Sequence, residues 1–271
     1  MARAPSPSRS ALAWLLDACA WALPPFVLFL LVLAAWQAAV SVFKLQAFYM
    51  PGPALVARAA WENRAALAQA TLTTGAAALT GFAGSLLGGF AIALAFSQSR
   101  IIRRSCFPYA IFLQTVPIVA IAPLIVTWFG YGFRSVAIVA FIIGLFPIIT
   151  TGTAGLTAID PALRELFEFH NATRWQLLWK LRLPLALPYF VSGARTSSGL
   201  SVIGAIVGEI FTGNTTTSFG LGYLVSQTAG NLKTAYLFAA VLASTLLGLL
   251  IFGAVTIAGE FLLRRWRLAG R

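Results

Sequence analysis

Long apolar segments, separated by short polar ones, dominate the chain. Each is about as long as the roughly 20 residues that an α-helix needs to cross the apolar part of a bilayer. The segments are residues 21–42, 74–96, 107–129, 137–156, 190–211 and 236–261. The pattern therefore predicts an all-α membrane protein, a bundle of six transmembrane helices.

The first two predicted spans are joined by an amphipathic segment. Residues 54–70 carry charged side chains among alanines, which predicts a helix lying on the membrane surface. In the second span Gly81, Gly84 and Gly88 lie along the helix, and the last two have the G-x-x-x-G spacing. This spacing predicts that another helix packs closely there.

The third predicted span, residues 107–129, contains Pro117, Pro123 and the polar Gln114. Prolines leave helix carbonyls without their usual partner, so we expect a kinked backbone whose free carbonyls meet neighbouring helices or water. Two interpretations stay open, namely simple packing and a helix that lines a path through the membrane. Gln114 and Pro117 are candidate pathway residues, although an interhelical hydrogen bond would also account for Gln114.

Glu209 is the acidic residue that the pattern places within the fifth span, near its outer end. A charge inside a bilayer costs free energy and usually has a function, so Glu209 is a candidate gate or pathway residue. A carboxylate that simply reaches water at the end of the span is the alternative. No lysine or arginine falls clearly at mid-membrane in this assignment.

A polar stretch, residues 160–184, interrupts the apolar pattern between the fourth and fifth spans. Asp160 can cap a helix start, and Pro161 suits the first helical position because its missing N–H would be unpaired there. Asn171 tolerates the left-handed backbone that ends a helix. The stretch therefore predicts one short helix that ends in a corner.

A second short helix is expected directly after this corner. Thr173 and Gln176 have the spacing of a capping box, in which each side chain bonds to the other residue's backbone N–H. Pro184 should end the helix, and Pro188 should mark the entry to the next apolar run.

The simplest interpretation of this stretch is a solvated connector between two spans. Its aromatic side chains, however, need cover from a membrane surface or a protein partner. These are Phe167, Phe169, Trp175 and Trp179. A DNA-reading helix pair is not expected, because both ends are tethered to apolar spans.

Composition and charge agree with a membrane protein. Apolar residues make up 59% of the chain and charged ones 10%, against about 45–50% and about 25% in soluble domains. The net charge of +12 does not indicate nucleic acid, because most of the 19 lysines and arginines cluster on one side of the predicted spans. By the positive-inside rule, both termini are then cytoplasmic.

One membrane domain, residues 20–271, is expected after a basic cytoplasmic tail at residues 1–19, with a cytoplasmic loop at about 160–188. A cleaved signal peptide is the competing interpretation of the N-terminus. No hydrophilic exported domain follows it, which favours the tail.

Few residues of this chain could carry out enzymatic chemistry. His170 is the single histidine, so neither a histidine-based metal site nor a Ser-His-Asp triad can be assembled. The chain has no G-x-x-x-x-G-K phosphate loop. We therefore expect no catalytic, cofactor-binding or metal-binding residues.

The polar stretch resembles the cytoplasmic loop of the permease subunits of ATP-binding-cassette (ABC) importers that work with a periplasmic binding protein. That loop reads E-A-A, three residues, G, nine residues, I-x-L-P. The aligned residues here are Glu165-Leu166-Phe167, Asn171 and Leu181-Arg182-Leu183-Pro184. Leu166 and Phe167 stand where the family has alanines, and Asn171 where it has glycine.

Further segments between about residues 70 and 262 look like the nitrate, sulfonate and taurine branch, which also includes carriers of thiamine-pyrimidine precursors. They are Pro117-Ile-Val-Ala120, Trp128-Phe-Gly130, Phe146-Pro147, Arg174-Trp175, Pro188-Tyr189, Gly204-Ala-Ile-Val-Gly-Glu209 and Gly220-Leu-Gly222. The resemblance implies a type I ABC importer permease in a bacterial inner membrane. Its substrate would be a small organic or inorganic anion, or a pyrimidine or vitamin precursor.

The same resemblance implies the partners. Two permease copies would form one pathway, two cytoplasmic ATPase subunits would bind the ATP, and a periplasmic or lipid-anchored binding protein would deliver the substrate. The residues implied to dock on the ATPase are Glu165, Leu166, Phe167, Glu168, His170, Asn171, Ala172, Thr173, Arg174 and Trp175.

Two other classes of protein are alternatives. An ion- or proton-coupled secondary carrier would want paired intramembrane charges, of which Glu209 supplies one, and we see no internal repeat. A membrane-bound enzyme would need more His, Asp and Cys.

Overall fold

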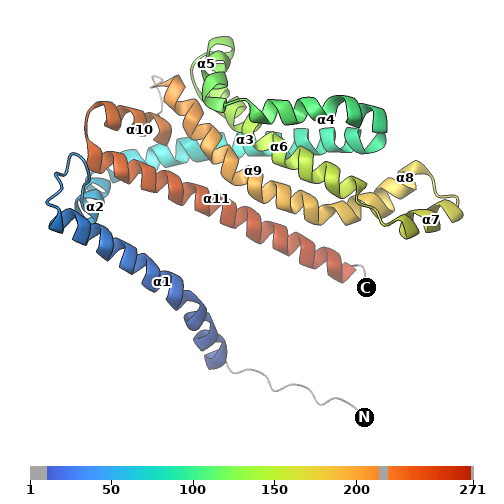
Figure 1. Cartoon of the computed structure of the whole chain (residues 1–271), viewed down its shortest axis with the longest axis horizontal. Helices are drawn as coiled ribbons and strands as arrows, with labels where there is room; N and C mark the ends of the chain where they lie inside the picture. The colour runs from blue at the N-terminus through green and yellow to red at the C-terminus, as the bar shows by residue number, and fades with distance from the viewer. Residues whose placement is uncertain (1–10, 214–218, 270–271) are drawn as a thin grey trace.

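The computed structural model describes residues 11–213 and 219–269, and this part of the chain contains helices and no strands. The long helices α3, α6, α9 and α11 lie side by side in one elongated bundle, and α1 extends away from it (Figure 1). The helices are α1 (Ala11–Val42), α2 (Pro53–Glu62), α3 (Arg64–Gln98), α4 (Arg100–Thr115), α5 (Ile118–Phe129), α6 (Phe133–Thr157), α7 (Pro161–Phe169), α8 (Arg174–Leu177), the π-helical turn η1 (Leu178–Arg182), α9 (Leu183–Thr212), α10 (Leu221–Gly230) and α11 (Thr234–Ala269).

Among the described residues, five helices are long and apolar enough to cross a membrane: α1, α3, α6, the continuous segment α8–η1–α9, and α11. The third predicted span is instead two helices, α4 and α5, with Val116 and Pro117 between them. Pro117 has no N–H and keeps the preceding residue out of the helical conformation. The expected kink is therefore a complete break.

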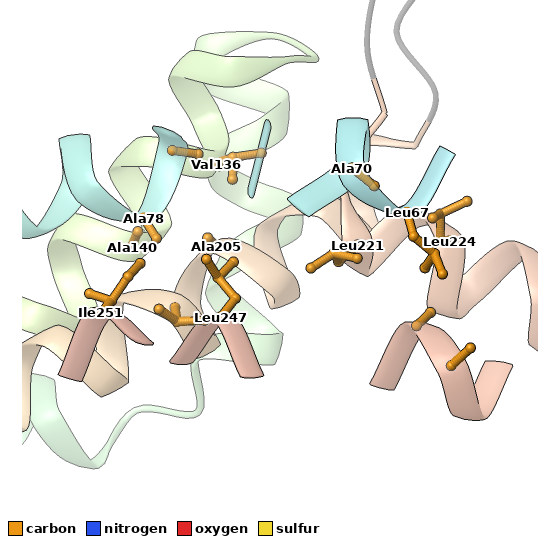
Figure 2. Close-up of a cluster of buried hydrophobic side chains, with 14 of the residues drawn as sticks. Leu67, Ala70, Ala78, Val136, Ala140, Ala205, Leu221, Leu224, Leu247 and Ile251 are labelled. Carbon is orange, nitrogen blue, oxygen red and sulfur yellow. The ribbon is translucent and has the colours of Figure 1, made fainter. Parts of the chain in front are cut away.

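The centre of the bundle is α6, which packs between α3 and α9. Small residues let these helices approach closely, as the G-x-x-x-G spacing predicts. A Cβ atom at Gly81 would lie 2.5 Å from Ala140 Cβ, and one at Gly84 or Gly88 would touch the Phe141 ring. Figure 2 shows the resulting core, in which Ala78, Ala140 and other small side chains lie between the helices.

Serine hydroxyls tie α6 to its neighbours inside this core. Ser85 Oγ on α3 donates to Phe141 O at 2.7 Å, and Ser197 Oγ on α9 donates to Gly144 O at 2.7 Å. Such interhelical bonds satisfy polar groups that lipid could not. The three central helices are therefore joined both by close packing and by hydrogen bonds.

Three boundaries differ from those expected. Residues 54–70 are not one surface helix, because α2 ends at Glu62 and the membrane helix α3 begins at Arg64. The segment between the fifth and sixth predicted spans, residues 212–233, was expected to be an outside loop, but it contains α10, whose Leu221 is fully buried. Residues 11–19 of the expected tail are the start of α1, and residues 1–10 lie outside the described residues.

Pro184 does not end a helix, contrary to the sequence-based expectation, and Pro188, expected at the entry to the next apolar run, lies inside α9. The backbone runs as helix from Arg174 to Thr212, with the wider turn η1 just before Pro184. In this turn Leu183 N–H donates to Leu178 O, five residues back. A π-helical turn takes up one extra residue, and so lets the chain pass a proline with a local bend instead of a stop.

Candidate functional site

The corner between α7 and α8 starts from a capped helix. Asp160 Oδ1 accepts a hydrogen bond from Ala162 N at 2.9 Å, and Pro161 occupies the first turn. Arg164 Nε and Glu168 Oε1 form an ion pair of 2.7 Å along the exposed surface of α7. The expected start of this helix is confirmed.

Asn171 turns the chain at the end of α7. Its φ of +51° lies in the left-handed region, as its position in the sequence predicts. Ala172 N donates to Phe167 O at 3.0 Å, and the His170 ring bonds through Nδ1 to Leu166 O at 2.8 Å. These bonds fix the corner with contacts inside the loop alone.

The second helix begins with the capping box that the sequence predicts. Thr173 N donates to Gln176 Oε1 at 2.8 Å, and Gln176 N donates to Thr173 Oγ1 at 3.3 Å. From here the helix continues through η1 into α9. The corner is therefore joined to a candidate membrane span by continuous helix.

The base of the corner is held to the bundle. Leu178 and Leu181 are buried, and Arg182 Nη1 donates to Ser97 O at the end of α3, at 3.0 Å. By contrast, α7 packs closely on no other helix in the described part of the chain and buries none of its residues. Figure 1 shows α7 and α8 projecting beyond the ends of the long helices.

The residues predicted to dock on a partner are mostly exposed. Phe167 and Ala172 are half-buried, and the other eight are open to a partner. Apolar side chains are among them, since Leu166 is 51% and Trp175 is 69% exposed. Glu165 forms no ion pair within residues 11–213 and 219–269. The loop thus presents both apolar surface and an available carboxylate.

Gln114 and the α4–α5 break lie beside α6. Gln114 borders a cavity of about 220 Å³ together with Pro147 on α6 and Leu200 on α9. Pro117 starts α5 next to this cavity. The two candidates therefore lie close to each other.

Glu209 lies elsewhere, at the far end of α9. It is 4% exposed, and its Oε2 accepts from Thr74 Oγ1 at 2.9 Å and from Gly222 N at 2.8 Å. Its surroundings share no residue with the cavity at Gln114. The structure therefore does not bring the three pathway candidates together, and their role in the pathway stays a prediction.

Arg195 and Glu260 form an ion pair that the sequence did not predict, between two candidate membrane helices. Arg195 Nη2 on α9 lies 3.5 Å from Glu260 Oε1 on α11. Arg195 is thirteen residues after Arg182 and fourteen before Glu209, which is about 20 Å along the helix from each. An arginine therefore lies near the middle of α9, and Glu209 is not the only acid within a candidate span, because Glu260 lies within Thr234–Trp266.

Small and polar residues occupy the exposed face of α9 beside this pair, and the exposed Tyr189 and Ile203 flank them on the same face. Ser192 and Thr196 are exposed, and a Cβ at Gly199 would meet nothing within 4 Å. The exposed face of α11 is instead made of large apolar side chains such as Leu246 and Leu249. The exposed face of α9 near the ion pair is therefore more polar than the exposed face of α11.

Sequence comparison places the chain among known transport proteins. Residues 84–267 match the family described as binding-protein-dependent transport system inner membrane component. The riboflavin transport system permease protein RibX of Chloroflexus aurantiacus is 36% identical over 89% of this chain and 88% of its own length. The formylaminopyrimidine transport permease protein ThiX of Halalkalibacterium halodurans is 31% identical over 91% and 96%.

A third relative and two solved structures also belong to transport systems. The aliphatic sulfonates transport permease protein SsuC of Escherichia coli, whose assignment is described as putative, is 31% identical over 93% of this chain and 92% of its own. Two inward-facing crystal forms of the MetNI methionine ABC transporter share the fold. Their TM-scores are 0.59 and 0.54, at 18% and 20% identity, over 74% and 80% of this chain and 96% and 98% of theirs.

These findings give no support to an ion-coupled secondary carrier. The relatives are permease proteins of transport systems, and the resemblance to a type I permease fold is confirmed. In this family the permease is not an enzyme, and the ATPase is a separate subunit. The chain therefore belongs to the binding-protein-dependent transport system inner membrane components, and it is a multi-pass permease subunit of an ABC importer.

Proposed function

We propose that the corner at residues 160–184 is the element through which a cytoplasmic ATPase drives this permease. The observation that carries the proposal is the combination of an exposed, internally fixed corner with an unbroken helix into α9. A rigid connection of this kind transmits a displacement without first absorbing it in a flexible loop.

The exposed docking residues suit a groove on the partner. Leu166 and Trp175 offer apolar surface at the corner, and Glu165 offers a carboxylate to a basic group of the ATPase. ATP, bound by the partner subunits and not by this chain, would change the position of the groove. The free energy of docking must differ between the two conformational states of the permease, since a partner that binds both states equally does not shift the equilibrium between them.

We further propose that two copies of the chain enclose the pathway. The polar face of α9 around Ser192 and Thr196 is open in the single chain. A second copy facing it would create a path lined by polar groups, while the apolar faces of α1 and α11 meet lipid. Gln114, Pro117 and the Arg195–Glu260 pair are then candidate lining residues, and Glu209 is a candidate residue at one end of the path.

The orientation follows from the corner and from the charges. If the corner meets a cytoplasmic ATPase, then Arg100, Arg103 and Arg104, next to its base, are cytoplasmic as well. The described part of α11 ends at the same level as this base (Figure 1), which supports a cytoplasmic C-terminus. We propose the same side for the N-terminus.

The substrate belongs to the classes carried by the relatives. RibX, ThiX and SsuC are named for riboflavin, formylaminopyrimidine and aliphatic sulfonates. We propose a small organic anion or a heteroaromatic vitamin precursor, delivered by a separate binding protein. Ligand binding to that protein, followed by uptake measurements, identifies the compound.

Co-purification tests the docking proposal. We expect a tagged wild-type chain to retain an ATP-hydrolysing partner when it is purified from its own membranes in mild detergent. Glu165→Arg should reduce the retained ATPase about tenfold, because it places a cation against the proposed basic group. Glu62→Arg, which reverses an exposed acid on α2, should leave it unchanged.

Two results would contradict the proposal. One is equal retention of the ATPase by both variants together with normal uptake in vesicles. The other is a wild-type chain that carries no nucleotide-hydrolysing protein under any mild condition.

A further inference from the structure

Four arginines line one cavity at the base of the corner. The cavity has a volume of about 240 Å³ and lies where the end of α3, the start of α4, the start of α7 and η1 meet. The arginines are Arg100, Arg103, Arg164 and Arg182. Its other lining residues are apolar or uncharged, so no carboxylate borders the cavity within the described chain.

The four guanidinium groups are poorly neutralised by the protein. Arg164 pairs with Glu168 at the exposed surface, at 2.7 Å. Arg182 donates through Nη1 to Ser97 O, while its buried Nε has no partner among the described residues. Arg100 and Arg103 form no ion pair within that part of the chain. Like charges gathered in this way repel one another unless an anion lies between them.

The position of the cavity indicates the kind of anion. Phe96 and Leu156, at the ends of two membrane helices, form its apolar wall, and the start of the basic helix α4 lies beside them. This is the level at which lipid phosphates lie, and basic pockets between membrane helices bind anionic head groups. About eight waters of about 30 Å³ would fill the volume, so a phosphate with an ester substituent fits.

We propose that the four arginines form a binding site for a phosphate-bearing anion, a phospholipid head group or free phosphate, which ties α7 to the ends of α3 and α4. Arg164 lies on α7, whereas Arg182 and Arg100 belong to the bundle. A ligand bound by both sets joins α7, which packs closely on no other helix among the described residues, to the bundle. Any effect of this anion on transport rests on the proposed docking of the corner to the ATPase, whereas the binding of the anion itself does not.

Hydrogen exchange of the α7 amides measures this tie without any ATPase. The protein is placed in nanodiscs of phosphatidylcholine alone, or with about one fifth phosphatidylglycerol as the anionic lipid. A third sample contains phosphatidylcholine nanodiscs and inorganic phosphate at millimolar concentration. We expect α7 to exchange about tenfold more slowly with the effective anion.

Charge-removing variants show whether the arginines are responsible. Arg100→Gln/Arg103→Gln should abolish the slower exchange and the retention of phosphatidylglycerol in native mass spectrometry. The matched control, Arg264→Gln/Arg265→Gln, removes two exposed positive charges at the end of α11 and should preserve both. Arg103→Lys should restore part of the retention, which a variant that failed to fold would not do.

The samples separate the two sources of phosphate. Slower exchange with phosphatidylglycerol alone identifies the lipid, and slower exchange with inorganic phosphate identifies the free anion. Unchanged exchange with both anions overturns the proposal, as does equal protection in the wild type and Arg100→Gln/Arg103→Gln. Loss of the ATPase in the separate Glu165→Arg experiment has no bearing on these outcomes.

Discussion

Thr74 and Glu209 are 135 residues apart in the chain, and their side chains share a buried hydrogen bond of 2.9 Å. Thr74 Oγ1 also accepts from Leu221 N at 2.8 Å, and Glu209 Oε2 accepts from Gly222 N at 2.8 Å. The pair therefore binds the first N–H groups of α10, which have no partner inside their own helix. A carboxylate also interacts favourably with the positive end of a helix dipole.

Replacing Thr74 by valine should destabilise the protein. Thr74→Val keeps the shape of the side chain but leaves Leu221 N–H without its partner and removes a donor from Glu209. We expect a loss of about 1 to 3 kcal/mol in the free energy of unfolding in detergent. Thr73→Val, at a half-buried position whose hydroxyl bonds only within α3, should change stability by less than about 0.5 kcal/mol, because it leaves no backbone N–H of α10 without a partner.

Amide exchange distinguishes this prediction from a general loss of packing. In Thr74→Val, the amides of Leu221 and Gly222 should exchange faster, while those in the centre of α6 stay protected. Equal stability of the Thr74→Val and Thr73→Val variants would show that α10 is held by apolar contacts alone.

The contrast between the corner and this pair shows what the sequence could predict. Asp160 with Pro161, Asn171, and Thr173 with Gln176 were predicted correctly because their hydrogen-bonding partners lie within a few residues. The contacts of Glu209 with Thr74 and Gly222 depend on where three helices meet, and no local spacing encodes that. The fold class was also predictable, because the length of an apolar segment is a local property of the sequence.

The misplaced helix ends have a similar explanation. Pro184 is a stop signal in the sequence, but the π-helical turn before it and the buried Leu178 and Leu181 keep the chain helical. Arg195 and Glu260 were not recognised because they lie in different spans, and each alone resembles a residue near a polar loop. In both cases contacts between helices determine the structure, and these contacts cannot be read from local sequence.

The Arg195–Glu260 pair should contribute to stability and to transport. Arg195→Gln or Glu260→Gln leaves one charge without its partner between α9 and α11. Because the two side chains are 32% and 53% exposed, we expect a cost of about 1 to 2 kcal/mol, below the range for fully buried pairs. The double variant should be more stable than the sum of the single effects predicts, as measured by a double-mutant cycle.

A surface pair in the same chain provides the control. Arg58 and Glu62 on α2 pair at 2.8 Å with both side chains largely exposed. The same cycle at this pair should give a coupling energy below about 1 kcal/mol. A cycle at Arg195–Glu260 with no larger coupling, and single variants with normal uptake, would show that the pair is incidental.

Because α3 packs closely on α6, one added methyl group between them should lower the free energy of unfolding substantially. A Cβ at Gly81 would lie 2.8 Å from both Ala137 O and Phe141 N, which are backbone atoms and cannot move aside. Gly81→Ala should therefore cost about 1 to 3 kcal/mol through overpacking. The free energy of unfolding in detergent provides the measurement.

Gly199 is the matched position on α9. A Cβ there would meet no atom within 4 Å, so Gly199→Ala should be neutral or stabilising by about 0.5 to 1 kcal/mol through helix propensity. Equal destabilisation by Gly81→Ala and Gly199→Ala in detergent would contradict the close packing of α3 on α6.

The corner itself depends on one backbone conformation, at Asn171. With φ at +51°, Asn171→Gly should keep the corner and its coupling, whereas Asn171→Val should strain it by about 1 to 2 kcal/mol. Asn171→Pro should be worse, because proline fixes φ near −65°. We expect all three variants to insert in the membrane, since the position is exposed and outside the spans. In vesicles with the ATPase and the binding protein, the valine and proline variants should hydrolyse ATP without driving uptake. Normal uptake by Asn171→Pro would show that the geometry of this corner is not what couples the two subunits.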